Sequence, residues 1–200
     1  METNKAIAIT ASVGFVGLSA LAALPGSRYF STTYRVSFLF LGVLLWTVYG
    51  LRERLHLRPI HFALFAMGLL LHDMGVFGAY RENFLSLDFD TYVHFYFGFA
   101  AGFILHRSFG LNYGLRGWTL AITVALVTLG IGGLHELIEF ASTLLLGPDK
   151  GMLKINDPDK FDTQKDLLNN LLGSLAAVLF ALAGPPLHSR STGGGKKREP

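Results

Sequence analysis

Residues 118–146 read WTLAITVALVTLGIGGLHELIEFASTLLL, an apolar run that only Thr and Gly interrupt before His135. A helix needs about 20 such residues to cross roughly 30 Å of hydrocarbon. Five more apolar runs recur along the chain, and in lipid the backbone must satisfy its own hydrogen bonds, so each run predicts a helix. The predicted fold is an all-α, polytopic membrane bundle. Its six transmembrane helices span about residues 6–24, 34–51, 60–80, 92–109, 118–146 and 167–184.

The composition supports a membrane protein and excludes several other classes. Of the 200 residues, 51% are hydrophobic and 16% charged, whereas soluble domains are about 25% charged. The mean hydropathy is +0.43, and a soluble chain of this length has too little interior to bury so much apolar surface. This excludes intrinsic disorder and collagen. The absence of cysteine excludes a disulfide scaffold, thiolate metal sites and cysteine nucleophiles.

We expect one transmembrane domain, residues 1–190, followed by a disordered basic tail, residues 191–200. The first apolar run could belong to a signal peptide, but it exceeds the usual 7–15 residues of such a core, which favours an uncleaved helix. If successive helices alternate in direction, ten of the 17 Lys and Arg residues lie on the same side of the membrane as the amino terminus. The excess of basic residues predicts that both termini are cytoplasmic.

The net charge of +3 indicates topology rather than nucleic-acid binding. The basic residues lie in short loops and in the tail and form no stripe along one helix face. Basic loops of membrane proteins face the cytoplasm and its anionic lipids. We therefore expect membrane lipids as partners and no nucleic acid.

Ionisable residues gather at the ends of four predicted helices. In an antiparallel bundle, the ends of the third and fifth helices and the starts of the fourth and sixth reach the same membrane face. Asp90 and His94 are four residues apart and share one helix face. The residues that should meet there are His72, Asp73, Asp90, His94, His135, Glu136, Glu139, Asp162, Gln164, Asp166, Asn169 and Asn170.

Carboxylates near the membrane are costly unless a cation, a proton or a basic group compensates them. Histidine with several carboxylates is typical of a site for Mg²⁺, Mn²⁺, Zn²⁺ or Fe²⁺. Without a cation, crowded carboxylates would form a proton-binding site instead. The predicted metal ligands are Asp90, His94, Glu136, Glu139, Asp162 and Asp166. Among these, Glu136, Glu139 and Asp166 are the predicted catalytic groups, with Asp73, Gln164 and Asn170 supporting them.

Each element of this cluster also has a structural interpretation. Glu136 and Glu139 would face headgroup water if their helix ended early, and Asp90 could cap a helix beside an interfacial histidine. Asp162 and Asp166 could be loop or capping residues, and His72 a packing residue. The histidines at positions 56, 61 and 106 lie toward the opposite face and receive no role. Small residues from Gly98 to Gly102 predict close packing against another helix.

The same residues carry a family resemblance. Residues 90–95 read DTYVHF, residues 136–139 read ELIE and residues 162–166 read DTQKD. This pattern resembles the YjdF-type bacterial inner-membrane family of unknown function, over about residues 60–180. More distantly, it is similar to VanZ-like membrane proteins, some of which are linked to glycopeptide resistance. Two details depart from the VanZ-like pattern: three residues rather than two separate Asp90 from His94, and Glu139 replaces a Gln.

Three function classes remain open at this point. A metal-dependent enzyme would act on a lipid or lipid-linked substrate at the membrane interface, although the sequence has no HExxH motif. An ion- or proton-coupled transporter would use the same carboxylates as a relay, although inverted repeats are not evident. A scaffold would use them to lock helices together. The resemblance implies the bacterial inner membrane, and a homo-oligomer remains open.

Overall fold

The structure is a computed structural model, and it describes residues 2–22, 32–76, 79–81, 83–147 and 161–183. Six α-helices lie within these residues: α1 (Glu2–Ala22), α2 (Thr32–Gly50), α3 (Pro59–Val76), α4 (Phe89–Asn112), α5 (Gly117–Leu146) and α6 (Asp162–Ala183). This confirms the predicted all-α helical bundle. The predicted tail, residues 191–200, lies outside the described residues.

Three of these helices are long and apolar enough to cross a membrane, judged by length and composition: Glu2–Leu21, Gly117–Leu145 and Asp162–Ala183. Phe40–Gly50 and Pro59–Gly75 are shorter apolar stretches. At 24 residues α4 is also long, but residues such as Asp90 and His106 lower its hydropathy. Helix α4, at the centre of the bundle, is therefore not among the three helices that meet this criterion.

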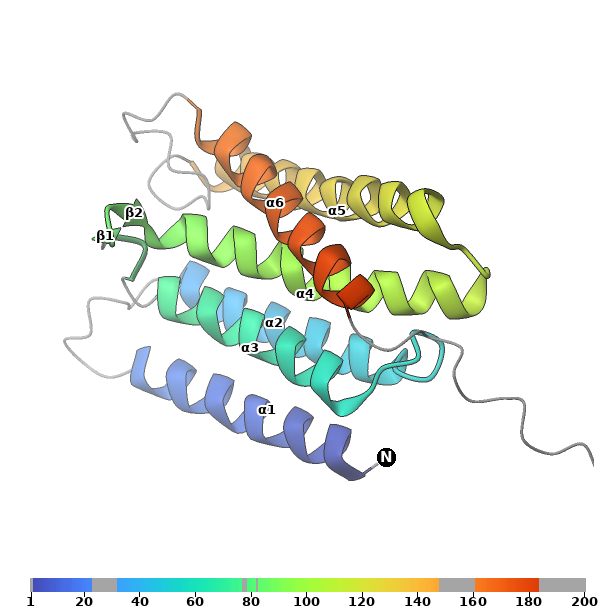
Figure 1. Ribbon diagram of the computed structural model, residues 1–200. Helices are drawn as coiled ribbons and strands as arrows, with labels where there is room; N and C mark the ends of the chain where they lie inside the picture. The colour runs from blue at the N-terminus through green and yellow to red at the C-terminus, as the bar shows by residue number, and fades with distance from the viewer. Residues whose placement is uncertain (1, 23–31, 77–78, 82, 148–160, 184–200) are drawn as a thin grey trace, which may run out of the picture.

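The helices lie side by side, with α4 between two groups (Figure 1). On one side α1 packs against α2 and α3, and α3 contacts α4; on the other side α5 and α6 contact α4 and each other. The core of the first group includes Ala8, Leu45 and Phe62, each fully buried. A smaller core around Val124 and Val178 joins α5 to α6. Burial of these side chains stabilises the fold through close packing, as expected inside a membrane bundle.

Small residues bring α4 and α6 into backbone contact. A Cβ atom at Gly98 would overlap the Asn170 carbonyl group, and one at Gly173 would overlap the Phe95 carbonyl oxygen. At Gly102 it would lie 3.0 Å from Ser174 Cα. The close packing predicted from Gly98 and Gly102 is therefore confirmed, and its partner is α6.

Three helix boundaries differ from those expected. The expected helix 60–80 ends at Val76, whereas α4 begins at Phe89 instead of residue 92 and α6 at Asp162 instead of residue 167. Hydropathy detects where apolar residues begin and end, but helices extend into polar turns. The first turns of α4 and α6 carry Asp90 and Asp162, and acidic side chains there interact favourably with the helix dipole.

Between α3 and α4 the chain forms a 3₁₀ turn, η1 (Ala79–Arg81), and a short hairpin of β1 (Asn83–Phe84) and β2 (Leu87–Asp88). The two loop residues have positive φ angles, 51° at Leu85 and 67° at Ser86, as a tight hairpin turn requires. The Tyr92 hydroxyl donates a hydrogen bond to the Phe84 carbonyl oxygen at 2.7 Å. This contact ties the hairpin to the start of α4.

Candidate metal centre

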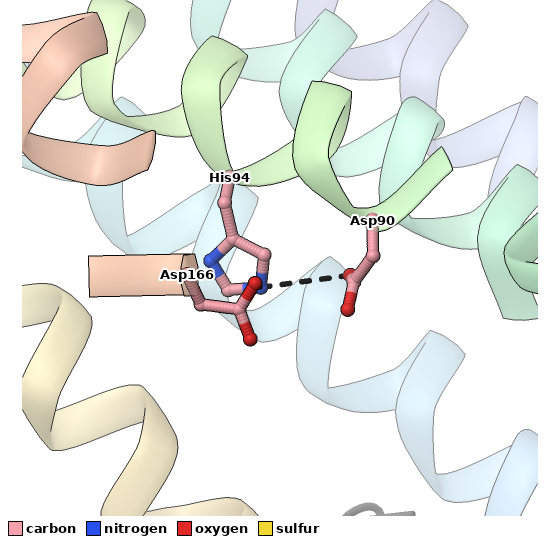
Figure 2. Close-up of side chains that lie close together, drawn as sticks. All are labelled: Asp90, His94 and Asp166. Atoms are coloured by element: carbon pink, nitrogen blue, oxygen red, sulfur yellow. Dashed lines mark ion pairs between the residues drawn. The ribbon is translucent and has the colours of Figure 1, made fainter. Parts of the chain in front are cut away.

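Three ligand-type side chains converge where α4 and α6 begin (Figure 2). His94 Nε2 lies 3.6 Å from Asp90 Oδ1 and 3.6 Å from Asp166 Oδ1. All three ligand atoms lie within 4.8 Å of one another. His94 and Asp166 are buried, and Asp90 is half-buried. We call Asp90, His94 and Asp166 the triad.

The second ring nitrogen of His94 meets α6. Asn170 Nδ2 lies 3.3 Å from His94 Nδ1, and Asn170 is fully buried. Its amide packs so tightly against α5 that a Cβ atom on Gly132 would lie 2.5 Å from Nδ2. Asn170 therefore holds the imidazole ring with Nε2 directed at the two carboxylates, as a residue behind a metal ligand commonly does.

Helix α5 brings three more ionisable side chains to the same end of the bundle. His135 Nε2 lies 3.3 Å from Glu139 Oε1. Glu136 is 6% exposed, and neither of its oxygens has a hydrogen-bond partner within the described part of the chain. The Thr163 hydroxyl approaches it, but without ordinary hydrogen-bond geometry. The Glu139 carboxylate is thus paired with His135, whereas the Glu136 oxygens lack a donor of ordinary hydrogen-bond geometry among the described residues.

Helix α3 and η1 close the cluster on another side. The Tyr80 hydroxyl lies 2.8 Å from His72 Nδ1. The His135 ring is 6.1 Å from the His72 ring and 6.0 Å from the His94 ring, measured between centroids. Burial, followed by the charges of Asp90 and Glu139, raises the pKa of Tyr80 well above its ordinary value of 10. The phenol therefore remains a neutral group that can donate a hydrogen bond.

The predicted site residues divide into three groups. The triad forms its centre, and Asp162, Glu136 and Glu139 lie close enough to Asp166 to interact with it electrostatically. Asp73 is fully buried in α3, and its carboxylate oxygens have no hydrogen-bond partner among the described residues; it acts electrostatically on Tyr80. Gln164 is exposed, and no polar contact joins it to the triad within the described residues.

Two structural interpretations of these residues are wrong. The residue that caps α4 is Asp88, not Asp90. Helix α5 continues to Leu146, so Glu136 and Glu139 lie about two to three turns before its end rather than in a frayed terminus.

The comparisons with known proteins identify the family of this chain. The sequence profile of the predicted membrane proteins named DUF2238 matches residues 6–184. The chain belongs to the DUF2238 family. It is also similar to the inner membrane protein YjdF of Escherichia coli (strain K12), with 30% identity over 93 residues. That alignment covers 46% of this chain and 44% of YjdF, so the chain spans less than half the length of this relative. No solved structure matches.

This DUF2238 protein is thus an integral membrane protein with a His and carboxylate cluster at one end of its helices. Sequence reasoning placed His72 and His135 at this membrane face without giving them a role in the site, and it did not include Tyr80. Tyr80 had the pattern of an interfacial aromatic residue, and a single histidine at a helix end carries no distinctive signal. A detectable signal was the position of His135, which is directly before Glu136 and four residues before Glu139, because residues four apart share a helix face.

Proposed function

We propose that this DUF2238 protein is a metal-dependent enzyme of the bacterial inner membrane, acting on the phosphate ester of a lipid or lipid-linked substrate. The observation that carries the proposal is the triad. Ligand atoms about 2.1 Å from a shared cation lie roughly 3–3.5 Å from one another, close to the 3.6 Å that separates His94 Nε2 from each aspartate. Two carboxylates would also balance a divalent charge.

The donor set restricts the metal. One imidazole and two carboxylates suit Zn²⁺, Fe²⁺ or Mn²⁺, and carboxylates with water also suit Mg²⁺. A catalytic site keeps a coordination position open for water or substrate beside three protein ligands. The bound cation would lower the pKa of a water molecule or neutralise a phosphate group.

The neighbouring side chains supply the proton chemistry. Glu136 is a suitable general base because its oxygens are buried and have no hydrogen bond of ordinary geometry within the described residues. The pairing with Glu139 would orient the His135 ring and stabilise its protonated form, so that this dyad can receive or return a proton. The predicted catalytic role of Asp166 becomes that of a ligand in this scheme.

The site's place in the bundle favours a lipid substrate. It lies where helices begin and end, beside the hairpin (Figure 1). On α5, Leu134 and Leu137 are 58% and 64% exposed and flank the polar residues. Exposed apolar side chains on a membrane helix face lipid tails, so a substrate with an acyl or prenyl chain can reach the cluster laterally. The resemblance to VanZ-like proteins stays a prediction.

Metal content is the first test. The detergent-purified protein should hold about one Zn, Fe or Mn per chain or take it up when the metal is added, and chelator should lower its thermal midpoint. Asp166→Asn should remove both effects. The matched control Asp88→Asn makes the same change at an exposed residue whose side chain forms no cap hydrogen bond, and it should retain the metal.

Catalysis is the second test. Phosphate release from long-chain lipid phosphates in mixed micelles should require the cation and should fall about 100-fold or more in Glu136→Gln. A protein that binds less than about 0.1 metal per chain and ignores chelator contradicts the proposal. Uptake of protons coupled to solute movement, or a change of stability alone, would then favour the transporter or the scaffold.

A further inference from the structure

The end of the bundle away from the triad carries a second cluster of polar groups. Arg58 directly precedes α3, His61 lies in its first turn, and Arg107 lies in the last turns of α4. His61 is 4% exposed, and its ring stacks on Phe103 with centroids 4.7 Å apart. Its Nδ1 atom is buried, and in the described part of the chain it has no partner of ordinary hydrogen-bond geometry, although the ring approaches the Arg58 backbone. A buried polar atom of this kind costs free energy unless a ligand satisfies it.

The positive charges of this cluster are not compensated. Arg58 and Arg107 both act electrostatically on His61, and Arg58 acts on Arg107; no carboxylate is among these neighbours in the described residues. Arg107 Nε donates to the His56 carbonyl oxygen at 2.8 Å, which fixes its guanidinium group. The Arg58 side chain is exposed and forms no hydrogen bond or ion pair with any described residue. Two guanidinium groups held together in this way favour an anion.

The start of α3 adds the positive end of a helix dipole. The Arg58 carbonyl oxygen accepts hydrogen bonds from the amides of His61 and Phe62. Pro59 has no amide hydrogen, and the Ile60 amide is a first-turn donor without a partner inside the helix. Backbone donors and dipole at a helix start bind phosphate and similar anions.

We propose that Arg58, His61 and Arg107 form a binding site for the phosphate group of an anionic phospholipid. Ile60, in the first turn of α3 and two residues after Arg58, is 55% exposed and offers apolar surface for the acyl chains. Basic pockets between transmembrane helices on the cytoplasmic side bind anionic headgroups, and our predicted topology places this end in the cytoplasm. The site is at the opposite end from the triad and does not depend on the metal.

The test measures lipid binding by the full-length protein in detergent. Phosphatidylglycerol should raise the thermal midpoint, and phosphatidylcholine with the same acyl chains should not. Arg58→Gln and Arg107→Gln should each weaken phosphatidylglycerol binding about 10-fold, which corresponds to the loss of one charge-assisted contact. Arg54→Gln is the matched control: it removes the same charge from an exposed residue at the same end and should change binding less than about 2-fold.

His61→Phe separates a ligand site from a packing role. Without a ligand, removal of an unsatisfied ring nitrogen should leave stability unchanged or raise it. If the site exists, this variant keeps its midpoint in phosphatidylcholine but loses affinity for phosphatidylglycerol. Arg107→Lys retains the positive charge and should retain phosphatidylglycerol binding. It keeps the test valid if Arg107→Gln fails to fold.

Three results would overturn the proposal. The first is equal stabilisation by both lipids. The second is an equal loss of affinity in Arg54→Gln and Arg58→Gln, which would indicate general surface charge. The third is saturation by inorganic phosphate with no preference for the lipid, which would assign the site to a free phosphate ion.

Discussion

The two ring nitrogens of His94 have different partners, and this difference organises the cluster. Nε2 faces Asp90 and Asp166, whereas Nδ1 faces Asn170. A neutral imidazole carries one proton, so a cation on Nε2 requires that proton on Nδ1. Asn170 can then present its amide oxygen, which a half-turn of the amide exchanges with the NH₂ group. This explains a fully buried asparagine on a helix face otherwise formed by small residues and Asp166.

The first residue-scale prediction concerns coupling within the triad. His94→Gln and Asp166→Asn should each abolish the stabilisation by added metal, because one lost ligand empties a three-ligand site. The double variant should then cost less than the sum of the single losses, by about 0.5–3 kcal/mol. Thermal or denaturant unfolding in detergent, with and without metal, measures this difference. Strictly additive losses, with no metal effect on the unmodified protein, would mean that the residues are independent neighbours.

The second residue-scale prediction concerns Asn170. Asn170→Leu should lower metal affinity about 10–100-fold, as loss of a residue behind a ligand typically does. Asn170→Asp should retain binding because a carboxylate accepts the Nδ1 proton. Asn169→Leu makes the same change at the adjacent, half-buried residue and should bind metal normally. Isothermal titration with Mn²⁺ or Zn²⁺ checks all three variants, and equal affinities for both Leu variants would refute the role.

At the scale of the elements, the contact between α4 and α6 sets the distance between the triad's two helices. Asp90 and His94 come from α4, and Asp166 comes from α6. Gly98 and Gly173 have no side chain at the crossing, so the backbones touch there. Close approach of backbones is the usual basis of tight helix association in membranes, and here it also brings the ligands within reach of one another.

This contact gives an element-scale prediction. Gly98→Ala should destabilise the protein by about 1–3 kcal/mol or more, because the new methyl group meets the Asn170 backbone rather than a movable side chain. The control is Gly133→Ala in α5, where a Cβ atom meets nothing within 4 Å. It should leave stability unchanged or slightly higher, since Ala favours helix over Gly. Thermal midpoints in detergent compare the two, and equal midpoints would contradict a tight crossing.

At the scale of the whole molecule, the two ends of the bundle have opposite character. One end carries the carboxylates and histidines of the triad and α5, and the other carries Arg58, Arg107 and their neighbours. Figure 1 shows the amino terminus at the end away from the hairpin, and the triad lies near the hairpin. Positive residues stay preferentially on the cytoplasmic side, so the charge asymmetry predicts that the end with the amino terminus faces the cytoplasm.

The topology prediction follows from this asymmetry. A reporter that is active in the cytoplasm should work when fused after residue 184, and one that is active outside should work in the segment 149–160. A reporter fused within residues 52–58 tests a second position that we expect in the cytoplasm. The opposite pattern would reverse the orientation, but it would leave the triad at one shared membrane face because helix alternation does not depend on direction.

The sequence alone determined the helical membrane class, the approximate place of each helix and the face on which the polar residues meet. The length of an apolar run and the alternation of helix direction can both be read along a single sequence, so neither requires the tertiary structure. The starts at Phe89 and Asp162 were misplaced because helices extend into polar turns that hydropathy does not register, whereas α3 ends at Val76, short of the expected residue 80.

The tertiary structure decided which polar residues touch. Asp90, His94 and Asp166 meet because glycine contacts set how closely α4 and α6 cross. Glu136 is buried without a hydrogen bond of ordinary geometry to any described residue. It also placed Gln164 outside the site and brought Tyr80 into it, beside His72. Such pairings depend on the crossing and rotation of helices far apart in sequence, which the spacing of residues within one helix does not contain.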